Sequence, residues 1–205
     1  MTARLVAMGA IVCALGSAAS ADIVGISGSI GDSTEQTGAT FSGSIDYTFN
    51  GGSNGTVVIT LNNDTPPAVG GYLTGFVFNI DSIDPTVAAA LSSATNANFL
   101  DTGNEAAPPF GNYLAGAALG ADWTGGGSPN GGIPVGGSAM FTFAVTASDA
   151  GSLSASSFVN GPNEFDFVAR FRGLSNGGSD KVPVPAPSAA ALLGLGGLAA
   201  IRRRR

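Results

Sequence analysis

The side chains in this sequence that could do chemistry are almost all carboxylates. The chain has fourteen Asp and Glu residues, no histidine and a single cysteine, Cys13. Without histidine, Ser-His-Asp triads, Cys-His dyads and histidine-ligated zinc or copper are excluded. None of the glycine clusters is followed by Gly-Lys-Ser/Thr, so the sequence indicates no phosphate-binding loop. The remaining chemistry is that of paired carboxylates and of metals held by oxygen ligands.

Two pairs of acids lie close together in the sequence. Asp81 and Asp84 follow an apolar run, and Asp101 and Glu105 lie on either side of Gly103. Carboxylates held about 5–10 Å apart in a cleft hydrolyse glycosidic bonds, so a polymer-degrading hydrolase is one hypothesis. The same four acids are the candidate Ca²⁺ ligands, because Ca²⁺ takes oxygen ligands from loops. Near pairs arise by chance among so many acids, so we expect no enzyme and no obligatory cofactor.

Two further groups are candidates for contact with a glycan. Trp123, the single tryptophan, could form a platform for sugar rings together with Tyr113. A lone tryptophan in a β domain is more often part of the core, because it buries a large apolar area. Arg170 and Arg172 alternate along one predicted strand and could meet an anionic glycan. The alternative is that they pair with nearby acids such as Asp166.

The charge of the central part of the chain argues against nucleic acid as a partner. Residues 22–181 contain all fourteen acids against three cations, which leaves a net charge of −11. Nucleic-acid binding requires clustered Lys and Arg to displace counterions. The simplest interpretation of the excess is solubility through self-repulsion, and the alternative is binding of divalent cations outside the cell.

Alternating apolar and polar residues predict an antiparallel β domain. Residues 39–49 place apolar side chains at every second position, and a glycine-rich turn connects them to a β-branched run at 56–61. This pattern is typical of a hairpin with one buried and one solvated face. The same reasoning predicts further strands at 72–80, 113–119, around Trp123, and at 138–146, 152–159 and 164–172.

One segment of the central part favours a helix instead. Asp84 and Pro85 have the residue types of a helix N-cap and a first helical position, so we expect a short helix over residues 86–94. Residues 95–137 are the least regular stretch. Seven or more short strands with glycine turns predict a mostly β fold, a single antiparallel β-sandwich or jelly-roll-like domain at residues 22–181.

The N-terminal residues predict export. Arg4 precedes an apolar run over residues 5–14, and Ala19-Ser20-Ala21 forms a small-x-small cleavage site. This order is typical of a secretory signal peptide, so we assign residues 1–21 to a signal helix and place cleavage after Ala21. The valine before Cys13 argues against a lipoprotein signal, and the mature chain is therefore expected to contain no cysteine.

The C-terminal residues 182–205 predict a membrane anchor in three parts. A proline-rich spacer comes first, because alternating prolines oppose both helix and central strand. An apolar helix over residues 188–201 follows, and a cluster of four arginines ends the chain. Such a cluster stays on the cytoplasmic side of a membrane. The residues of the spacer motif and of the cluster are Val182, Pro183, Pro185, Ala186, Pro187, Arg202, Arg203, Arg204 and Arg205.

These three parts together resemble the PEP-CTERM sorting signals that exosortases process in Gram-negative and related bacteria. The family's Pro-Glu-Pro is here Pro185-Ala186-Pro187, a variant of the motif. The resemblance covers residues 182–205 and implies an exosortase-type enzyme and the secretion machinery as partners. It also implies a cell-surface or extracellular location, with a transient inner-membrane anchor whose C-terminus is cytoplasmic.

The function expected from these signals is that of an exported, surface-anchored protein. Its role would be structural or interactive, in an envelope, biofilm or extracellular matrix, as the resemblance implies. The alternative is an extracellular glycan-binding module whose partner is a polysaccharide. The carboxylate hydrolase is a third hypothesis.

Overall fold

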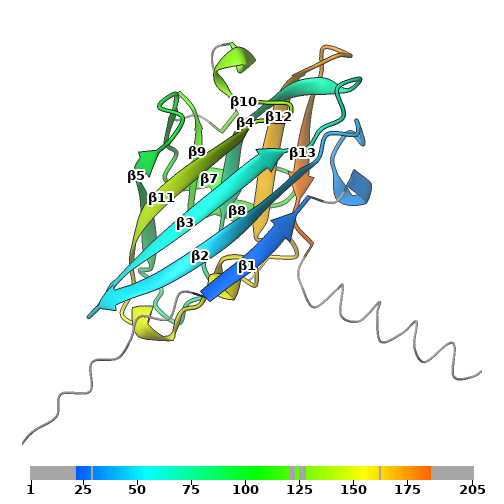
Figure 1. Ribbon diagram of the computed structural model, residues 1–205. Helices are drawn as coiled ribbons and strands as arrows, with labels where there is room; N and C mark the ends of the chain where they lie inside the picture. Colours follow the sequence, from blue (N-terminus) through cyan, green and yellow to red (C-terminus); the bar gives the residue numbers. More distant parts are fainter. Residues whose placement is uncertain (1–21, 29, 121–122, 125–127, 162, 186–205) are drawn as a thin grey trace, which may run out of the picture.

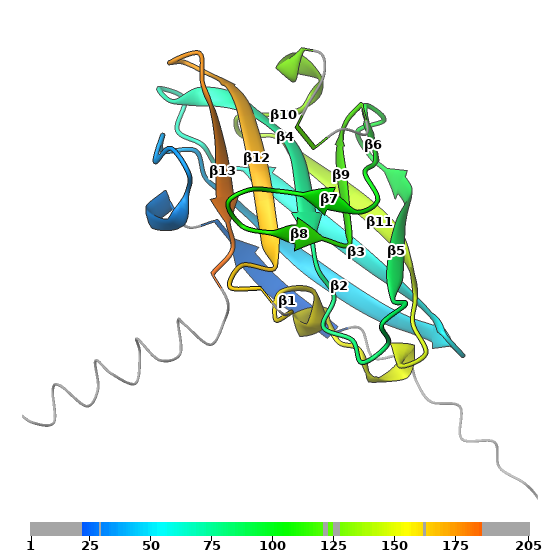
Figure 2. The same ribbon diagram turned by 180° about the vertical axis from the view of Figure 1, so that it is seen from behind.

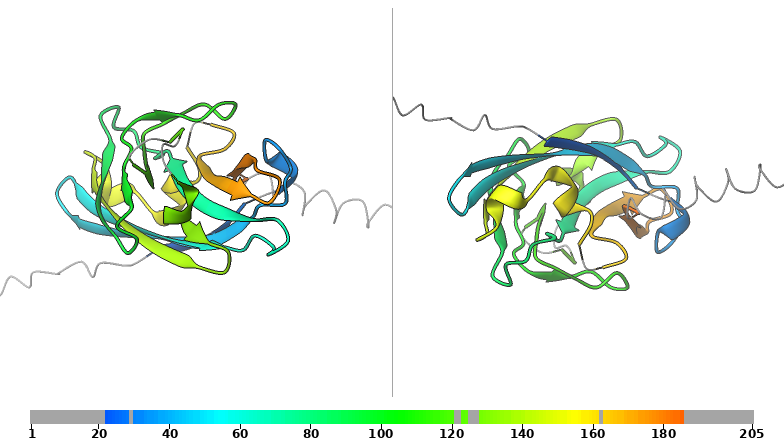
Figure 3. Two further views of the ribbon diagram at one scale, coloured as in Figure 1. Left: turned by 90° about the horizontal axis from the view of Figure 1, so that it is seen from above. Right: turned by 90° about the horizontal axis from the view of Figure 1, so that it is seen from below.

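The computed structural model describes residues 22–28, 30–120, 123–124, 128–161 and 163–185. They form a mostly antiparallel β structure in which two sheets pack face to face (Figures 1 and 3). The first sheet has the order β1-β2-β3-β11-β5, and the second has the order β13-β12-β4-β9-β6, with β10 also paired to β4. The chain passes between the sheets several times, for example from β3 to β4 and from β11 to β12.

The strands of the first sheet are β1 (Asp22–Ser27), β2 (Phe41–Gly51), β3 (Asn54–Asn63), β5 (Ala88–Ala94) and β11 (Ser138–Thr146). Those of the second sheet are β4 (Gly70–Phe78), β6 (Phe99–Asp101), β9 (Ala115–Leu119), β10 (Ile133–Pro134), β12 (Phe167–Leu174) and β13 (Ser179–Pro183). A separate hairpin pairs β7 (Glu105–Ala106) with β8 (Asn112–Tyr113). Four short 3-10 helices complete the described elements: η1 (Ile30–Asp32), η2 (Pro129–Gly131), η3 (Ala150–Ser152) and η4 (Ala155–Phe158).

The predicted alternation is confirmed most clearly in the first sheet. The β2–β3 hairpin turns through Gly51 and Gly52, which have φ of 101° and 61°, values that glycine adopts without a Cβ clash. β11 has the predicted bounds, and its inward residues alternate with outward ones as expected. Phe141 and Phe143 from this strand are fully buried.

Phenylalanine rings fill the space between the two sheets. Phe76 of β4 stacks on Phe167 of β12 at a centroid distance of 5.5 Å, and meets Phe141 of β11 edge-on at 4.7 Å. Offset and edge-on ring pairs add roughly 0.5–1.5 kcal/mol each beyond the burial of their area. These contacts join β4 and β12 to β11, and so hold the two sheets in a fixed relation.

The helix predicted over residues 86–94 is wrong, because this segment forms the edge strand β5. It pairs with β11, with a register shift between Thr142 and Phe143. Asp84 does not cap a helix: its Oδ1 accepts bonds from the N–H and the hydroxyl of Thr86, as in an Asx-turn. Backbone pairing with β11 thus outweighs the helix propensity of the alanines in this segment.

The strand predicted at residues 152–159 is also absent from the described structure. Residues 152–159 contain η4, which a reciprocal pair of bonds between Ser154 and Ser157 caps, so serine capping replaces the strand. Trp123 lies in a turn, and the rest of the strand predicted around it, at residues 121–122 and 125–127, lies outside the described residues. The predicted strand at 164–172 is confirmed from Phe167 onward, where β12 begins.

β13 extends to Pro183, two residues past the boundary expected after Lys181. Val182 is fully buried, and the N–H of Val184 donates to the carbonyl of Phe167. Proline is tolerated here because β13 is an edge strand, where a missing N–H costs no ladder bond. The signal helix at residues 1–21 and the helix at 188–201 lie outside the described residues.

Candidate functional site

The outer face of the second sheet is the part of the molecule with the features of a binding site. The β7–β8 hairpin lies across this face, as Figure 2 shows. Beneath it a small apolar cluster joins the hairpin to the sheet, formed by Val77, Ala107, Tyr113, Trp123 and Val168. The sequence predicted a solvated outer face for β12, and this cluster covers part of it.

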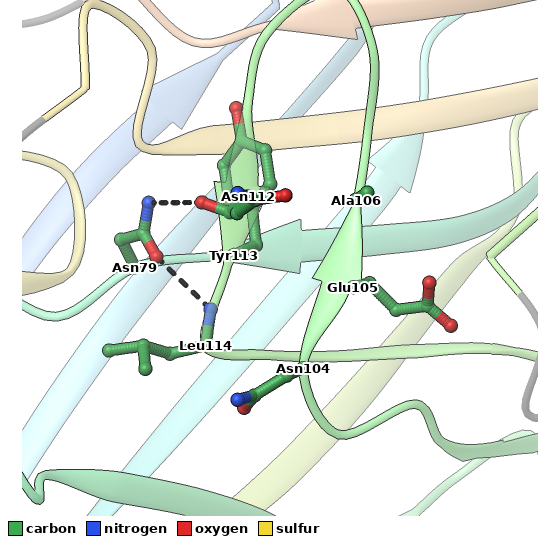
Figure 4. Close-up of a pocket in the computed structure, with 7 residues that line it drawn as sticks. All are labelled: Asn79, Asn104, Glu105, Ala106, Asn112, Tyr113 and Leu114. Carbon is green, nitrogen blue, oxygen red and sulfur yellow. Dashed lines mark hydrogen bonds between the residues drawn. The ribbon is translucent and has the colours of Figure 1, made fainter.

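A pocket of about 400 Å³ opens between this hairpin and the end of β4 (Figure 4). Four of its residues bring polar side chains, and the others are Ala106, Tyr113 and Leu114. The polar residues are Asn79, Asn104, Glu105 and Asn112. A carboxamide carries both donors and acceptors, so such a lining matches ligands that are rich in hydroxyl groups.

Asn79 is the fixed point of the pocket. Its Nδ2 donates to the carbonyl of Asn112 at 3.2 Å, and its Oδ1 accepts the N–H of Leu114 at 3.1 Å (Figure 4). These bonds tie the residue after β4 to β8 of the hairpin and to the link between β8 and β9. Asn79 is itself buried, so its bonds hold the floor of the pocket while Asn104 projects at the exposed rim.

A buried carboxylate lies behind Asn79. Asp166 is 1% exposed, and its Oδ1 accepts bonds from Asn79 Nδ2 at 3.3 Å and from the N–H of Asn163 at 3.1 Å. Its Oδ2 has no hydrogen-bond partner among the residues that the structure describes. Burial raises the pKa of this carboxyl above its usual value, and the hydrogen bonds from Asn163, Asn79 and Gly161 only partly oppose that effect. Burial, and then the charge of Asp166, also raise the pKa of Tyr113, whose hydroxyl donates to the carbonyl of Phe165.

Two of the three cations of residues 22–181, Arg170 and Arg172, line a second hollow on the same face. Arg170 of β12 lies opposite Lys181 of β13, and Arg172 lies opposite Ser179. The arginines and Ser179 line a hollow of about 390 Å³ together with Pro129, Gly173, Gly177 and Gly178. Burial, and then the charge of Arg170, lower the pKa of Lys181. Arg170 donates to the carbonyl of Trp123.

The acids proposed from sequence as metal or catalytic pairs are engaged in turn structure. Asp84 accepts the N–H of Ser148 at 2.6 Å as well as the Thr86 bonds, and these bonds lower the pKa of Asp84. Asp81 lies on the same connection and donates its own N–H to the carbonyl of Ser157. Nearby, the hydroxyl of Ser82 is the main cause of the lowered pKa of Asp149. These bonds stabilise the link between β4 and β5.

Asp101 and Glu105, the second predicted pair of acids, have different roles. Asp101 Oδ2 accepts the N–H of Leu91 at 2.7 Å, and its Oδ1 accepts the N–H of Gly103 at 2.8 Å. Glu105 lines the pocket at the hairpin. Among the residues that the structure describes, no three Asp, Glu, His or Cys side chains converge on a point where a metal ion would sit.

The aromatic platform predicted as one alternative does not form at the surface. Trp123 is 1% exposed and Tyr113 is 2% exposed, so both belong to the apolar cluster below the hairpin. The carboxamide pocket was missed at the sequence level. One signal pointed toward it: Asn79 interrupts the otherwise apolar sequence Phe76-Val77-Phe78-Asn79-Ile80, where a polar side chain needs hydrogen-bond partners.

The predicted sorting and cleavage residues divide between the described and undescribed parts of the chain. Val182 and Pro183 belong to β13, and Pro185 follows it. The remaining predicted residues lie outside the described part: Ala19, Ala21, Ala186, Pro187, Arg202, Arg203, Arg204 and Arg205. Within the described ranges, no helix has the length and apolar character needed to cross a membrane.

Comparisons with known proteins assign this chain to no group. No family model matches it, and neither the curated proteins nor the solved structures contain a significant match.

Proposed function

We propose that this chain is an exported, surface-anchored protein with an interaction role in an envelope, biofilm or extracellular matrix. The described domain begins at Asp22, the residue expected to follow signal-peptide cleavage. Asp22 is tied into the fold, since its carboxylate accepts the N–H of Ala155 at 3.1 Å. A cleavage after Ala21 would therefore leave the domain whole.

The proposed anchor follows the described domain in the sequence, so its removal would also leave the domain whole. The described residues continue to Pro185, and in the sequence the apolar run and the arginine cluster come after it. An exosortase-type enzyme acting beyond Pro185 would leave both sheets undisturbed. The positive-inside rule supports a transient inner-membrane topology with the arginines in the cytoplasm and the domain exported.

At finer detail we propose that the fold is a β-sandwich with jelly-roll-like crossings between the sheets. Two packed sheets and repeated passages between them support this class.

The ligand that the site supports best is a neutral or weakly charged glycan. The observation that carries this proposal is the lining of the pocket by Asn79, Asn104, Glu105 and Asn112. Amide and carboxylate groups form paired hydrogen bonds with adjacent hydroxyls, and the fixed Asn79 lowers the ordering cost of binding. This interaction role does not require the carboxylates to act as acid and base.

Calorimetric titration with a panel of extracellular polysaccharides tests the proposal. At least one polysaccharide is expected to bind, and Asn104→Ala is expected to weaken binding about fivefold through loss of about one net hydrogen bond. Asn54→Ala is the matched control, because Asn54 is an exposed asparagine at the start of β3 in the other sheet. Equal affinity of both variants would refute the pocket as the glycan site.

A further inference from the structure

The edge strand β1 presents a row of backbone groups that no described residue covers. It pairs with β2 on one side in a regular antiparallel ladder without a bulge. Figure 1 shows it at the border of the first sheet, with β2 on one side only. Its residues, Asp22–Ser27, include no proline, lysine or arginine. Such an edge is a template for pairing with another strand.

The other three edges of the two large sheets, at β5, β6 and β13, are protected. β6 has only three residues. On β5, the N–H of Leu91 donates to the carboxylate of Asp101. On β13, the N–H of Thr34 donates to the carbonyl of Lys181, and the hydroxyl of Thr34 accepts the N–H of Lys181. Natural sheets blunt their edges by such devices, and β1 departs from that pattern.

The ladder fixes which groups of β1 point outward. The N–H of Gly28 donates to the carbonyl of Phe41, so residue 28 faces β2. Because an antiparallel ladder alternates, the N–H and C=O groups of Ile23, Gly25 and Ser27 point away from β2. These three residues are spaced evenly about Gly25. A two-fold axis at Gly25 would therefore bring each outward group opposite a matching group.

Gly25 has no role in the packing of its own chain. A Cβ built at this position meets no atom within 4 Å, and its φ lies outside the left-handed region. Apart from Gly31, every other glycine of the described residues either has a positive φ or would bring a Cβ within 3.5 Å of a neighbour. Glycine within a strand weakens it, and it often marks a place where another backbone approaches.

The charge distribution also favours this edge for contact between copies. The outward side chains of β1, β2, β3 and β11 are mainly Ser, Thr, Asn and Ala, and Asp46 is the acid among them. With strands about 4.8 Å apart, two Asp46 carboxylates would lie about 14 Å apart or more across a joined sheet. That separation exceeds the Debye length of about 8 Å at physiological salt.

From these observations we propose that β1 pairs antiparallel with β1 of a second copy of this chain, with Gly25 opposite Gly25. The first sheets of the two copies become one continuous sheet. Ile23 lies opposite Ser27 of the other copy, and each facing pair of outward residues exchanges two hydrogen bonds. The interface lies on the opposite sheet from the carboxamide pocket, so its test is independent of the glycan proposal.

Cysteine cross-linking of the full chain with Cys13→Ala tests the register. Chains with Ile23→Cys and Ser27→Cys, expressed together, are expected to form a disulfide dimer, since facing Cα atoms lie about 5.5 Å apart. Each variant alone is expected to stay monomeric on a non-reducing gel, because its own cysteines would be about 13 Å apart. Ile23→Cys with Thr146→Cys is the control, because both residues are exposed on the same sheet face.

A second pair of variants tests the backbone contact itself. Gly25→Pro removes an outward N–H without removing a bond to β2, and it is expected to abolish the cross-link while the thermal melt stays cooperative. Gly25→Ala keeps the N–H and is expected to retain the cross-link. Cross-linking no stronger than that of the Thr146 control would overturn the proposal. Persistence of the cross-link in a folded Gly25→Pro chain would overturn it as well.

Discussion

Asp180 is the residue whose replacement most sharply tests the hydrogen-bond reasoning. It is 1% exposed, and its carboxylate accepts five bonds. Oδ1 accepts from the hydroxyl of Thr34 and the N–H groups of Glu35 and Lys181, at 2.8–3.0 Å. Oδ2 accepts from the N–H and the hydroxyl of Thr37, at 3.0 and 2.7 Å. The carboxylate thus holds the segment after η1 against β13.

Asp180→Asn keeps the shape but replaces one acceptor oxygen by a donor nitrogen. In either orientation of the amide, at least two bonds to a charged acceptor are lost. Each such bond contributes about 1.5–3 kcal/mol, and the losses are not fully additive, so we expect a cost of about 3 kcal/mol. For a domain of this size that corresponds to a fall in Tm of about 10 °C.

The pH dependence gives a second check on Asp180. Burial raises its pKa, but the bonds from Thr37, Glu35 and Thr34 outweigh burial and hold the pKa below the usual value. A depressed folded pKa stabilises the fold above the unfolded pKa of about 4, and this contribution is lost as the pH falls through the folded value. The difference between wild type and variant should therefore shrink below about pH 4.

Thermal melts and urea titrations between pH 3 and pH 7 measure both effects. Asp32→Asn is the control, because Asp32 is an exposed acid of η1 in the same segment and its change removes the same charge. Its cost is expected to stay within about 0.5 kcal/mol. Equal melting temperatures for the two variants at pH 7 would refute the reasoning.

Two further predictions follow from buried groups in the two sheets. Because burial raises the pKa of Asp166, ionisation of this carboxyl lowers the stability of the fold as the pH rises above the ordinary pKa of about 4. Asp166→Asn is expected to remove this pH-dependent loss of stability. Melting temperatures that fall equally with pH in wild type and variant would contradict the prediction. A Cβ at Gly43 would lie 2.1 Å from the carbonyl oxygen of Thr60, so Gly43→Ala is expected to cost about 2 kcal/mol in urea titrations. Gly25→Ala, in the adjacent strand, should leave the midpoint nearly unchanged, and similar midpoints for both glycine variants would count against the packing described.

Sequence periodicity predicted the strands whose two faces differ in environment. In β11, Phe141 and Phe143 are buried between polar or small neighbours, and the period of two gives the strand its bounds. Periodicity did not predict β5. Ala89 is buried there, but its neighbours are also small residues, so the two faces of the strand differ little in hydrophobicity. There the pairing partner β11 decides the conformation, and that partner is about fifty residues away in the chain.

The candidate site was less accessible from the sequence because it depends on long-range contacts. Asn79 meets Asn112 and Asp166, which are 33 and 87 residues away. Nothing in the local sequence relates these three residues. Trp123 was assigned correctly to the core by its size alone, since a large apolar side chain favours burial wherever it lies.

The role of Pro183 was misjudged for a related reason. Local rules identify proline as a breaker of central strands, and β13 is an edge strand, where proline is permitted. Whether a strand lies at an edge is a property of the whole sheet.

Intact-mass measurement of the protein isolated from its native host tests the central claim most directly. Export and anchoring predict a mature chain that begins at Asp22 and lacks the residues after the Pro185-Ala186-Pro187 motif, or carries a modification in their place. Recovery from the cytosol of a chain that runs unmodified from Met1 to Arg205 would contradict it.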